Sequence, residues 1–220
     1  MDLNFKFKVA TRTLDAFIRT RLGRYVKPRR YQQIFDEIDR IKPRVIMEIG
    51  AWNGARAEEM IRKASKHHPA QEIEYIGFDL FEKMNKDIYK HEISKLPPSE
   101  TNVRNRLETT GAKITLLAGY TTETMKNISS LPHPDLVFID GGHEAETVRN
   151  DWESVKKVMN SGTVVIFDDY WHNRQDGPKV VIDAIDRGEY KVSLMPEVDV
   201  FFNPDFGRLV ISLVKVMKQQ

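Results

Sequence analysis

The sequence contains no cysteine, which excludes disulfide bonds, thiolate metal ligands and a cysteine nucleophile. This absence fits a reducing compartment, and we expect a cytoplasmic protein. No apolar run approaches the roughly 20 residues that a membrane-spanning helix needs. The N-terminus has no apolar segment followed by a small-residue cleavage site, so we expect no signal peptide. A net charge of only +2 argues against a chain that binds nucleic acid over its whole surface.

The 220 residues are 40% hydrophobic, which is enough for one domain with a full core. Charge is unevenly distributed, because residues 1–30 carry nine basic and two acidic side chains, a net +7 that leaves −5 for the rest. We therefore divide the chain into a basic helical arm, 1–30, and a domain, 31–220. The arm either packs on the domain or on a second copy of the chain, or it touches anionic lipid, glycolipid or nucleic acid.

Strand and helix patterns alternate along the domain. The predicted strands are 45–49, 74–78, 113–118, 135–139, 163–167, 190–195 and 208–216, and the main predicted helices are 31–41, 55–64, 144–159 and 180–187. Residues 82–110 form a long charged crossover, mostly helical and broken by Pro97 and Pro98, in which Ser99 or Thr101 caps the second helix. It is either a lid over the strand ends or ordinary surface helix.

This alternation predicts an α/β fold with a doubly wound, Rossmann-like sheet of seven strands between two helical layers. The sheet should be mostly parallel, with an antiparallel C-terminal strand, because a short connection joins the last two strands. In such sheets ligands bind beyond the carboxyl ends of the strands.

The first strand runs into the segment Glu48-Ile49-Gly50-Ala51-Trp52-Asn53-Gly54, followed by a helix. Such a unit brings a ligand against backbone N–H groups at a helix N-terminus. The spacing Glu-x-Gly-x-x-x-Gly differs from the Gly-x-Gly-x-x-Gly of dinucleotide folds. An acid here repels a pyrophosphate and suits a ligand with an ammonium group, which favours S-adenosylmethionine over NAD; a plain tight turn is the alternative.

The second strand ends at Asp79, whose carboxylate can accept hydrogen bonds from both hydroxyls of a ribose. Its alternative role is to cap the next helix.

The fourth and fifth strands end at Asp140 and at Asp168-Asp169, which would repel one another without a cation. Oxygen ligands suit Mg²⁺, Mn²⁺ or Ca²⁺, of which we expect Mg²⁺ or Mn²⁺; otherwise these aspartates serve as turn and cap residues. His143, in the first turn of the next helix, is either a general base or a surface histidine.

With these motifs in view, the chain resembles class I S-adenosylmethionine-dependent methyltransferases over about residues 31–220. The loop Glu48–Gly54 is similar to that of the catechol O-methyltransferase branch. The segments Asp140–His143 and Asp168–Tyr170 are similar to those of macrocin-type sugar O-methyltransferases. The catechol branch has a lysine at the position of His143 and Asp-Asn at the position of Asp168-Asp169, which speaks against a catechol acceptor.

The resemblance implies roles by position. Cofactor contacts fall on Glu48, Gly50, Ala51, Trp52, Asn53, Gly54, Asp79, Leu80, Gly119, Tyr120, Thr121 and Asp140, with Asp79 at the ribose and Leu80 at the adenine. Asp140, Asp168 and Asp169 would bind the divalent metal, and His143 or Asp140 would remove the acceptor proton. We therefore expect metal-assisted O-methylation of a small molecule or sugar. The alternatives are an N-methyltransferase, or a nucleic-acid- or membrane-binding protein with a vestigial cofactor site.

Overall fold

The computed structural model describes residues 6, 11, 28–85, 97–203 and 207–219. Most of the predicted basic arm lies outside the described residues, as do 86–96 of the charged crossover and 204–206 of the last connection. The division at residue 30 therefore stays a prediction.

The described residues form a seven-stranded sheet with the order β3-β2-β1-β4-β5-β7-β6. Its strands are β1 (Val45–Ile49), β2 (Glu74–Asp79), β3 (Lys113–Ala118), β4 (Leu136–Ile139), β5 (Val164–Trp171), β6 (Tyr190–Asn203) and β7 (Gly207–Lys218). β1 to β5 pair in parallel, and β7 pairs antiparallel with both β5 and β6. The predicted sheet, including its antiparallel C-terminal strand, is confirmed.

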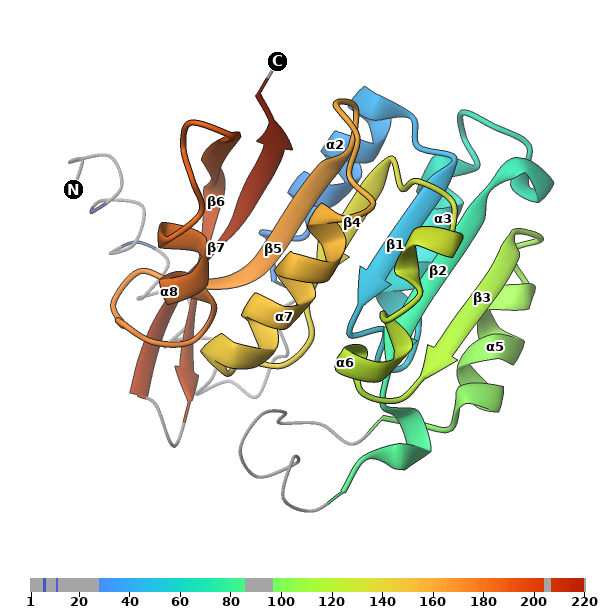
Figure 1. Cartoon of the computed structure of the whole chain (residues 1–220), viewed down its shortest axis with the longest axis horizontal. Coiled ribbons are helices and arrows are strands. Elements are labelled where there is room, and N and C mark those ends of the chain that lie inside the picture. Colours follow the sequence, from blue (N-terminus) through green and yellow to red (C-terminus); the bar gives the residue numbers. More distant parts are fainter. Residues whose placement is uncertain (1–5, 7–10, 12–27, 86–96, 204–206, 220) are drawn as a thin grey trace.

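Helices cover both faces of this sheet (Figure 1). One face carries α2 (Gln32–Ile41), α3 (Ala55–Ala64) and α5 (Glu100–Glu108), and the other carries α6 (Thr121–Thr124), α7 (Ala145–Lys156) and α8 (Pro178–Asp183). Each layer buries an apolar stripe against the strands, such as Val148, Trp152 and Val155 of α7. Ser99 caps α5, as its hydroxyl accepts the Asn102 N–H at 3.3 Å.

Two strands are longer than their apolar runs predicted. β5 continues through Asp168 and Asp169 to Trp171, with a shift of its register against β7 between Phe167 and Tyr170. Asp169 has a φ of +55°, so the chain turns locally at this bulge. β6 likewise passes through Pro196 at a second irregularity, where a strand tolerates proline.

The carboxyl ends of the parallel strands meet at one edge of the sheet, toward which the arrowheads of β1 and β3 point in Figure 1. The loops after β1, β2, β3 and β4 lie at this edge, together with the bulge of β5. In a doubly wound fold, ligands bind at this edge, beyond the carboxyl ends of the strands.

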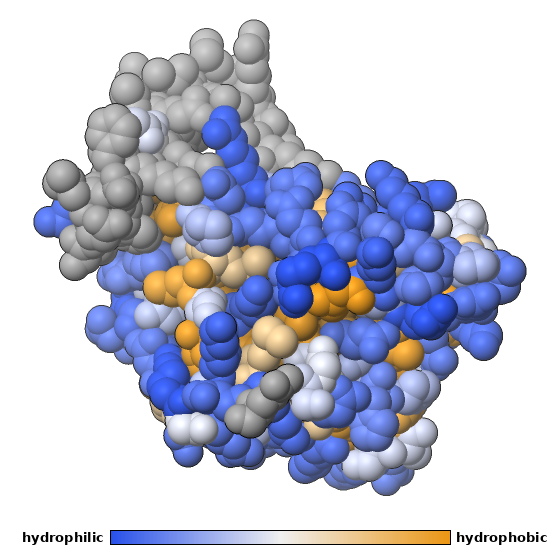
Figure 2. All heavy atoms as spheres, turned by 90° about the horizontal axis from the view of Figure 1, so that it is seen from above, coloured by the Kyte–Doolittle hydropathy of each residue, from blue (hydrophilic) through white to orange (hydrophobic). Residues whose placement is uncertain are grey.

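Among the described residues, no helix is both long and apolar enough to cross a membrane. Seen from above the view of Figure 1, hydrophilic side chains cover most of the surface, and hydrophobic ones show between them in smaller patches (Figure 2).

Candidate active site

The loop after β1 takes a shape that only glycine permits. Gly50 has a φ of +92°, and a Cβ atom built there would lie 2.1 Å from the carbonyl oxygen of Asp140. Its N–H donates to the carbonyl of Phe78 at 2.8 Å. Gly54, also at positive φ, immediately precedes α3. The glycines therefore let the loop turn sharply and lie directly against the backbone that follows β4.

Asp79 ties this loop to the end of β2. Its Oδ2 accepts the N–H of Trp52 at 2.6 Å, and its Oδ1 accepts the N–H of Phe81 at 3.0 Å. Burial raises the pKa of Asp79, although the backbone donors oppose that rise. A carboxylate offers about four acceptor positions, so Asp79 keeps capacity for a ligand hydroxyl.

An open pocket of about 560 Å³ lies beside Asp79. It is lined by Ile49, Gly50, Phe78, Asp79, Leu80, Gly119, Tyr120, Thr121, Gly141, Gly142, Thr147 and Asp151. The structure thus brings together six of the residues predicted to contact a cofactor: Gly50, Asp79, Leu80, Gly119, Tyr120 and Thr121.

The other residues predicted to contact the cofactor do not line this pocket. Glu48 is completely buried, and the hydroxyl of Tyr75 donates a short hydrogen bond to its Oε2. Burial raises the pKa of Glu48 to about 7. Ala51 is buried as well, whereas Trp52 is 38% exposed. Glu48 is therefore held in the core by Tyr75 and does not line the cavity.

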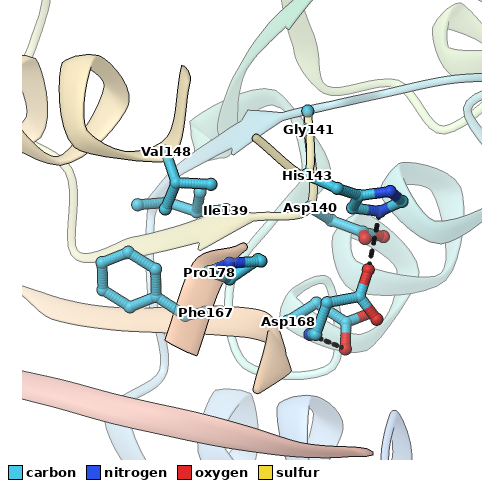
Figure 3. Close-up of a pocket in the computed structure, with 10 residues that line it drawn as sticks. Ile139, Asp140, Gly141, His143, Val148, Phe167, Asp168 and Pro178 are labelled. Carbon is cyan, nitrogen blue, oxygen red and sulfur yellow. Dashed lines mark hydrogen bonds and ion pairs between the residues drawn. The ribbon is translucent and has the colours of Figure 1, made fainter. Parts of the chain in front are cut away.

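The predicted acidic cluster is present at the ends of β4 and β5. One carboxylate oxygen each from Asp140, Asp168 and Asp169 lies within 4.8 Å of the other two. These aspartates and His143 line a second, much smaller pocket, which shares Gly141 and Gly142 with the larger one. Figure 3 shows Asp140, Asp168 and His143 gathered at one side of this pocket, away from its apolar wall.

A guanidinium group lies inside this cluster. Arg30 donates from Nε to Asp168 Oδ1 at 2.6 Å and from Nη2 to Asp168 Oδ2 at 2.8 Å. Its Nη2 also lies 3.6 Å from Asp169 Oδ1, and its Nη1 lies 3.6 Å from Asp199 Oδ2. Arg30 is only 4% exposed. The paired fork is the strongest geometry for an arginine and a carboxylate.

Two further donors complete the surroundings of Asp168. The hydroxyl of Tyr31 donates to its Oδ2 at 2.8 Å, and the N–H of Asp169 donates to its Oδ1 at 2.7 Å. With the two bonds from Arg30, each oxygen accepts two hydrogen bonds, which uses the roughly four acceptor positions of a carboxylate. A metal ion held by all three aspartates does not fit this arrangement, since Asp168 has no lone pair left to offer.

His143 pairs with Asp169, with 2.8 Å between Nε2 and Oδ2. The histidine lies in the loop before α7 rather than in its first turn, and its ring meets Trp171 edge-on at 5.6 Å. Burial works to raise the pKa of Asp169, but His143 and Arg30 lower it overall. Burial and the charges of Asp168 and Asp169 raise the pKa of Asp140 well above its usual range. Burial therefore disfavours the charged form of Asp140.

Sequence reasoning missed four residues at this edge. Arg30 and Tyr31 contact Asp168 across more than 130 residues of sequence, and Arg30 had been counted with the basic arm. Thr147 and Asp151 of α7 line the larger pocket, and Asp151 is only 1% exposed. The sequence did contain a signal for Asp151: it is an acidic residue on the apolar face of an amphipathic helix, beside Val148 and Trp152.

A family model described as a methyltransferase domain matches residues 47–170, which is more than half of the chain. The chain belongs to this methyltransferase family. The matched region spans the glycine loop, Asp79, the larger pocket and the three aspartates. A comparison with curated proteins finds no match.

Solved structures with the same fold include several O-methyltransferases. A putative O-methyltransferase from Klebsiella pneumoniae has 15% identity and a TM-score of 0.61, over 89% of this chain and 82% of that one. The Bacillus cereus O-methyltransferase in complex with SAH has 14% identity and a TM-score of 0.60, over 89% and 83%. TomG from Streptomyces achromogenes, an O-methyltransferase of tomaymycin synthesis in complex with SAM, has 13% identity and a TM-score of 0.61, over 93% and 88%. At these identities the likeness establishes the fold.

Proposed function

We propose that this chain transfers a methyl group from S-adenosylmethionine to a hydroxyl oxygen of a small molecule or sugar. Membership of a methyltransferase family supports the reaction type. The described binding of SAH and SAM to the Bacillus cereus protein and to TomG supports the cofactor, and their description as O-methyltransferases supports oxygen as the acceptor atom.

One observation carries the proposal: two pockets adjoin at Gly141 and Gly142. The larger pocket holds Asp79 and the glycine loop, which suit a nucleoside. The smaller one holds His143 and the aspartates, which suit proton removal from an acceptor. Methyl transfer needs a donor site and a base site in contact, because the acceptor oxygen must come close to the methyl carbon.

Residues of the larger pocket would hold the cofactor as follows. Asp79 would accept hydrogen bonds from the ribose hydroxyls, and Tyr120, which is 45% exposed, would cover the adenine. Gly50 lets the ligand approach the backbone closely. When bound, S-adenosylmethionine supplies a methyl group that is activated by its attachment to a positively charged sulfur.

His143 would remove the proton from the acceptor hydroxyl. Asp169 orients the imidazole through its contact with Nε2 and stabilises the imidazolium that forms. Asp140 is a second candidate base, because it lines the same pocket as His143. The pockets share a wall at Gly141 and Gly142, so the deprotonated oxygen would face the donor site.

The divalent ion expected from the sequence has no step in this proposal. It would use Asp140, Asp168 and Asp169, and would lower the pKa of the acceptor hydroxyl. The saturation of Asp168 by Arg30, Tyr31 and a backbone N–H disfavours that ligand set. The metal assistance expected from the sequence is therefore not part of the reaction proposed here, and titration with Mn²⁺ tests it directly.

The alternatives differ in what they require. An N-methyltransferase would methylate amines in the same assay. A nucleic-acid- or membrane-binding role would use the basic arm, most of which lies outside the described residues, and its binding would weaken steeply with salt. A purely binding role does not account for a histidine paired with an aspartate beside the donor pocket, whereas an N-methyltransferase could use the same pair.

Calorimetry with S-adenosylhomocysteine tests the donor site. The wild-type chain should bind it, and Asp79→Ala should weaken binding at least about tenfold, which corresponds to about 1.4 kcal/mol. Asp36→Ala is the matched control, because Asp36 is exposed on α2. Binding of NAD without binding of S-adenosylhomocysteine would overturn the proposal.

Methyl transfer to a panel of sugars, phenols, catechols and amines tests the acceptor site. His143→Ala should reduce turnover roughly 10²–10⁴-fold if the imidazole is the base, while S-adenosylhomocysteine binding stays unchanged. Transfer to amines with no transfer to hydroxyls would favour the N-methyltransferase instead.

A further inference from the structure

The acidic cluster has a positively charged group of its own. The guanidinium of Arg30 lies within 3.6 Å of carboxylate oxygens of Asp168, Asp169 and Asp199. Repulsion among the aspartates was the sequence-based reason to expect a metal ion. The positive charge of Arg30 lies beside these carboxylates and offsets their repulsion, so a metal ion is no longer needed for that purpose.

Arg30 is held in place from several directions. Its backbone N–H donates to Asp199 Oδ2 at 2.9 Å, and its carbonyl accepts from Gln33 Nε2 at 3.2 Å. Its guanidinium carbon lies 4.4 Å from the ring centre of Tyr31 and 5.4 Å from that of Phe201. The backbone bonds fix the residue itself, and moving its side chain aside for a metal ion would break both bonds to Asp168 and the contacts with the two rings.

Displacement by a metal ion is also electrostatically unfavourable. A divalent ion bound beside Arg30 would meet a like charge at short distance in a partly buried site, where screening by solvent is weak. The aspartates also offer a metal ion fewer ligand atoms than expected. Asp168 already accepts four hydrogen bonds, and Asp169 pairs with His143.

We propose that Arg30 is the resident cation of the cluster formed by Asp140, Asp168 and Asp169, and that it keeps divalent metal ions out of this site. Arg30 is thus a positioning residue, which fixes Asp168 and, through the shared charge, the Asp169–His143 pair. The inference concerns metal binding and is independent of the reaction assigned above.

Titration of the full-length chain with Mn²⁺, followed by calorimetry and by the EPR signal of free Mn²⁺, tests this directly. The wild type should bind Mn²⁺ only weakly. Arg30→Met keeps most of the apolar volume but removes the charge, and it should bind Mn²⁺ at least tenfold more tightly. Arg29→Ala is the matched control, since it removes the same charge from an exposed neighbour and should change nothing.

Each outcome decides the question. Tight Mn²⁺ binding by the wild type that is lost in Asp169→Asn would overturn the proposal, even if Arg30→Met does not fold. A folded Arg30→Met that binds Mn²⁺ no better than the wild type would overturn it too. The S-adenosylhomocysteine titration is separate, so failure of the proposed reaction is distinguishable from failure of this inference.

Discussion

Replacing Asp168 with alanine should destabilise the fold strongly, because it leaves the buried guanidinium of Arg30 without its main partner. The Arg30 side chain is 5% exposed and that of Asp168 is 1% exposed. Breaking a buried ion pair by removing one partner costs about 3–5 kcal/mol. Asp169 and Asp199 remain at 3.6 Å and offset part of the loss. We therefore expect a value near the lower end, about 3 kcal/mol.

Thermal unfolding measures this effect. For a domain of this size each kcal/mol lowers the melting temperature by about 2–4 °C, so Asp168→Ala should lower it by roughly 6–12 °C. Glu153→Ala is the control: it breaks the exposed pair with Lys156, and such pairs contribute only about 0–1 kcal/mol. Combining Arg30→Met with Asp168→Leu should restore much of the stability. A shift for Asp168→Ala no larger than that for Glu153→Ala would refute the buried pair.

Three further predictions concern the glycine loop and its surroundings. Because burial raises the pKa of Glu48 from 4.5 to about 7, its contribution to stability is present below pH 4.5 and is lost as the pH rises to 7. Urea unfolding should show a loss on the order of 3 kcal/mol across that window, absent in Glu48→Gln. Gly50→Ala should lower stability by at least about 2 kcal/mol in the same assay, because its Cβ would strike the Asp140 carbonyl at a positive φ. Gly162→Ala should cost clearly less, because its Cβ would approach only the side-chain oxygen of Asn160, at 3.3 Å. Ser99→Ala should cost about 1 kcal/mol by removing the cap of α5, which hydrogen exchange of that helix can confirm.

Most of the fold could be predicted from the sequence because strands and helices carry different periodicities. The helix at 55–64 and the strands at 45–49 and 113–118 coincide with α3, β1 and β3. The end of β5 could not be predicted, since an apolar run stops at Asp168 while the backbone pairing with β7 continues to Trp171. Pairing depends on the partner strand and on a bulge, neither of which is visible in a local pattern.

The position of a candidate site residue could be predicted where that residue follows closely after a predicted strand. Asp79, Asp140 and His143 were found in this way, and they meet at one sheet edge because the topology is regular. Arg30 was not, because its contact with Asp168 joins positions 138 residues apart. A count of charges along the chain places Arg30 in a basic segment and leaves the aspartates without a counterion. Only the fold shows that the charges of Arg30 and the aspartates balance each other.

The loop after β1 and the loop after β4 touch each other, and this contact bears on how such a site could accelerate methyl transfer. The N–H of Asp140 donates to the carbonyl of Ile49 at 2.8 Å, and the missing side chain of Gly50 lets the two backbones touch. The donor loop and the first residue of the acidic cluster therefore belong to one rigid unit. Arg30 fixes the other half, since it binds Asp168, the neighbour of the aspartate that orients His143. Because an error of about 1 Å in alignment can cost about 10²-fold in rate, these backbone contacts and the buried arginine would align base and donor in the proposed reaction without a metal ion as template.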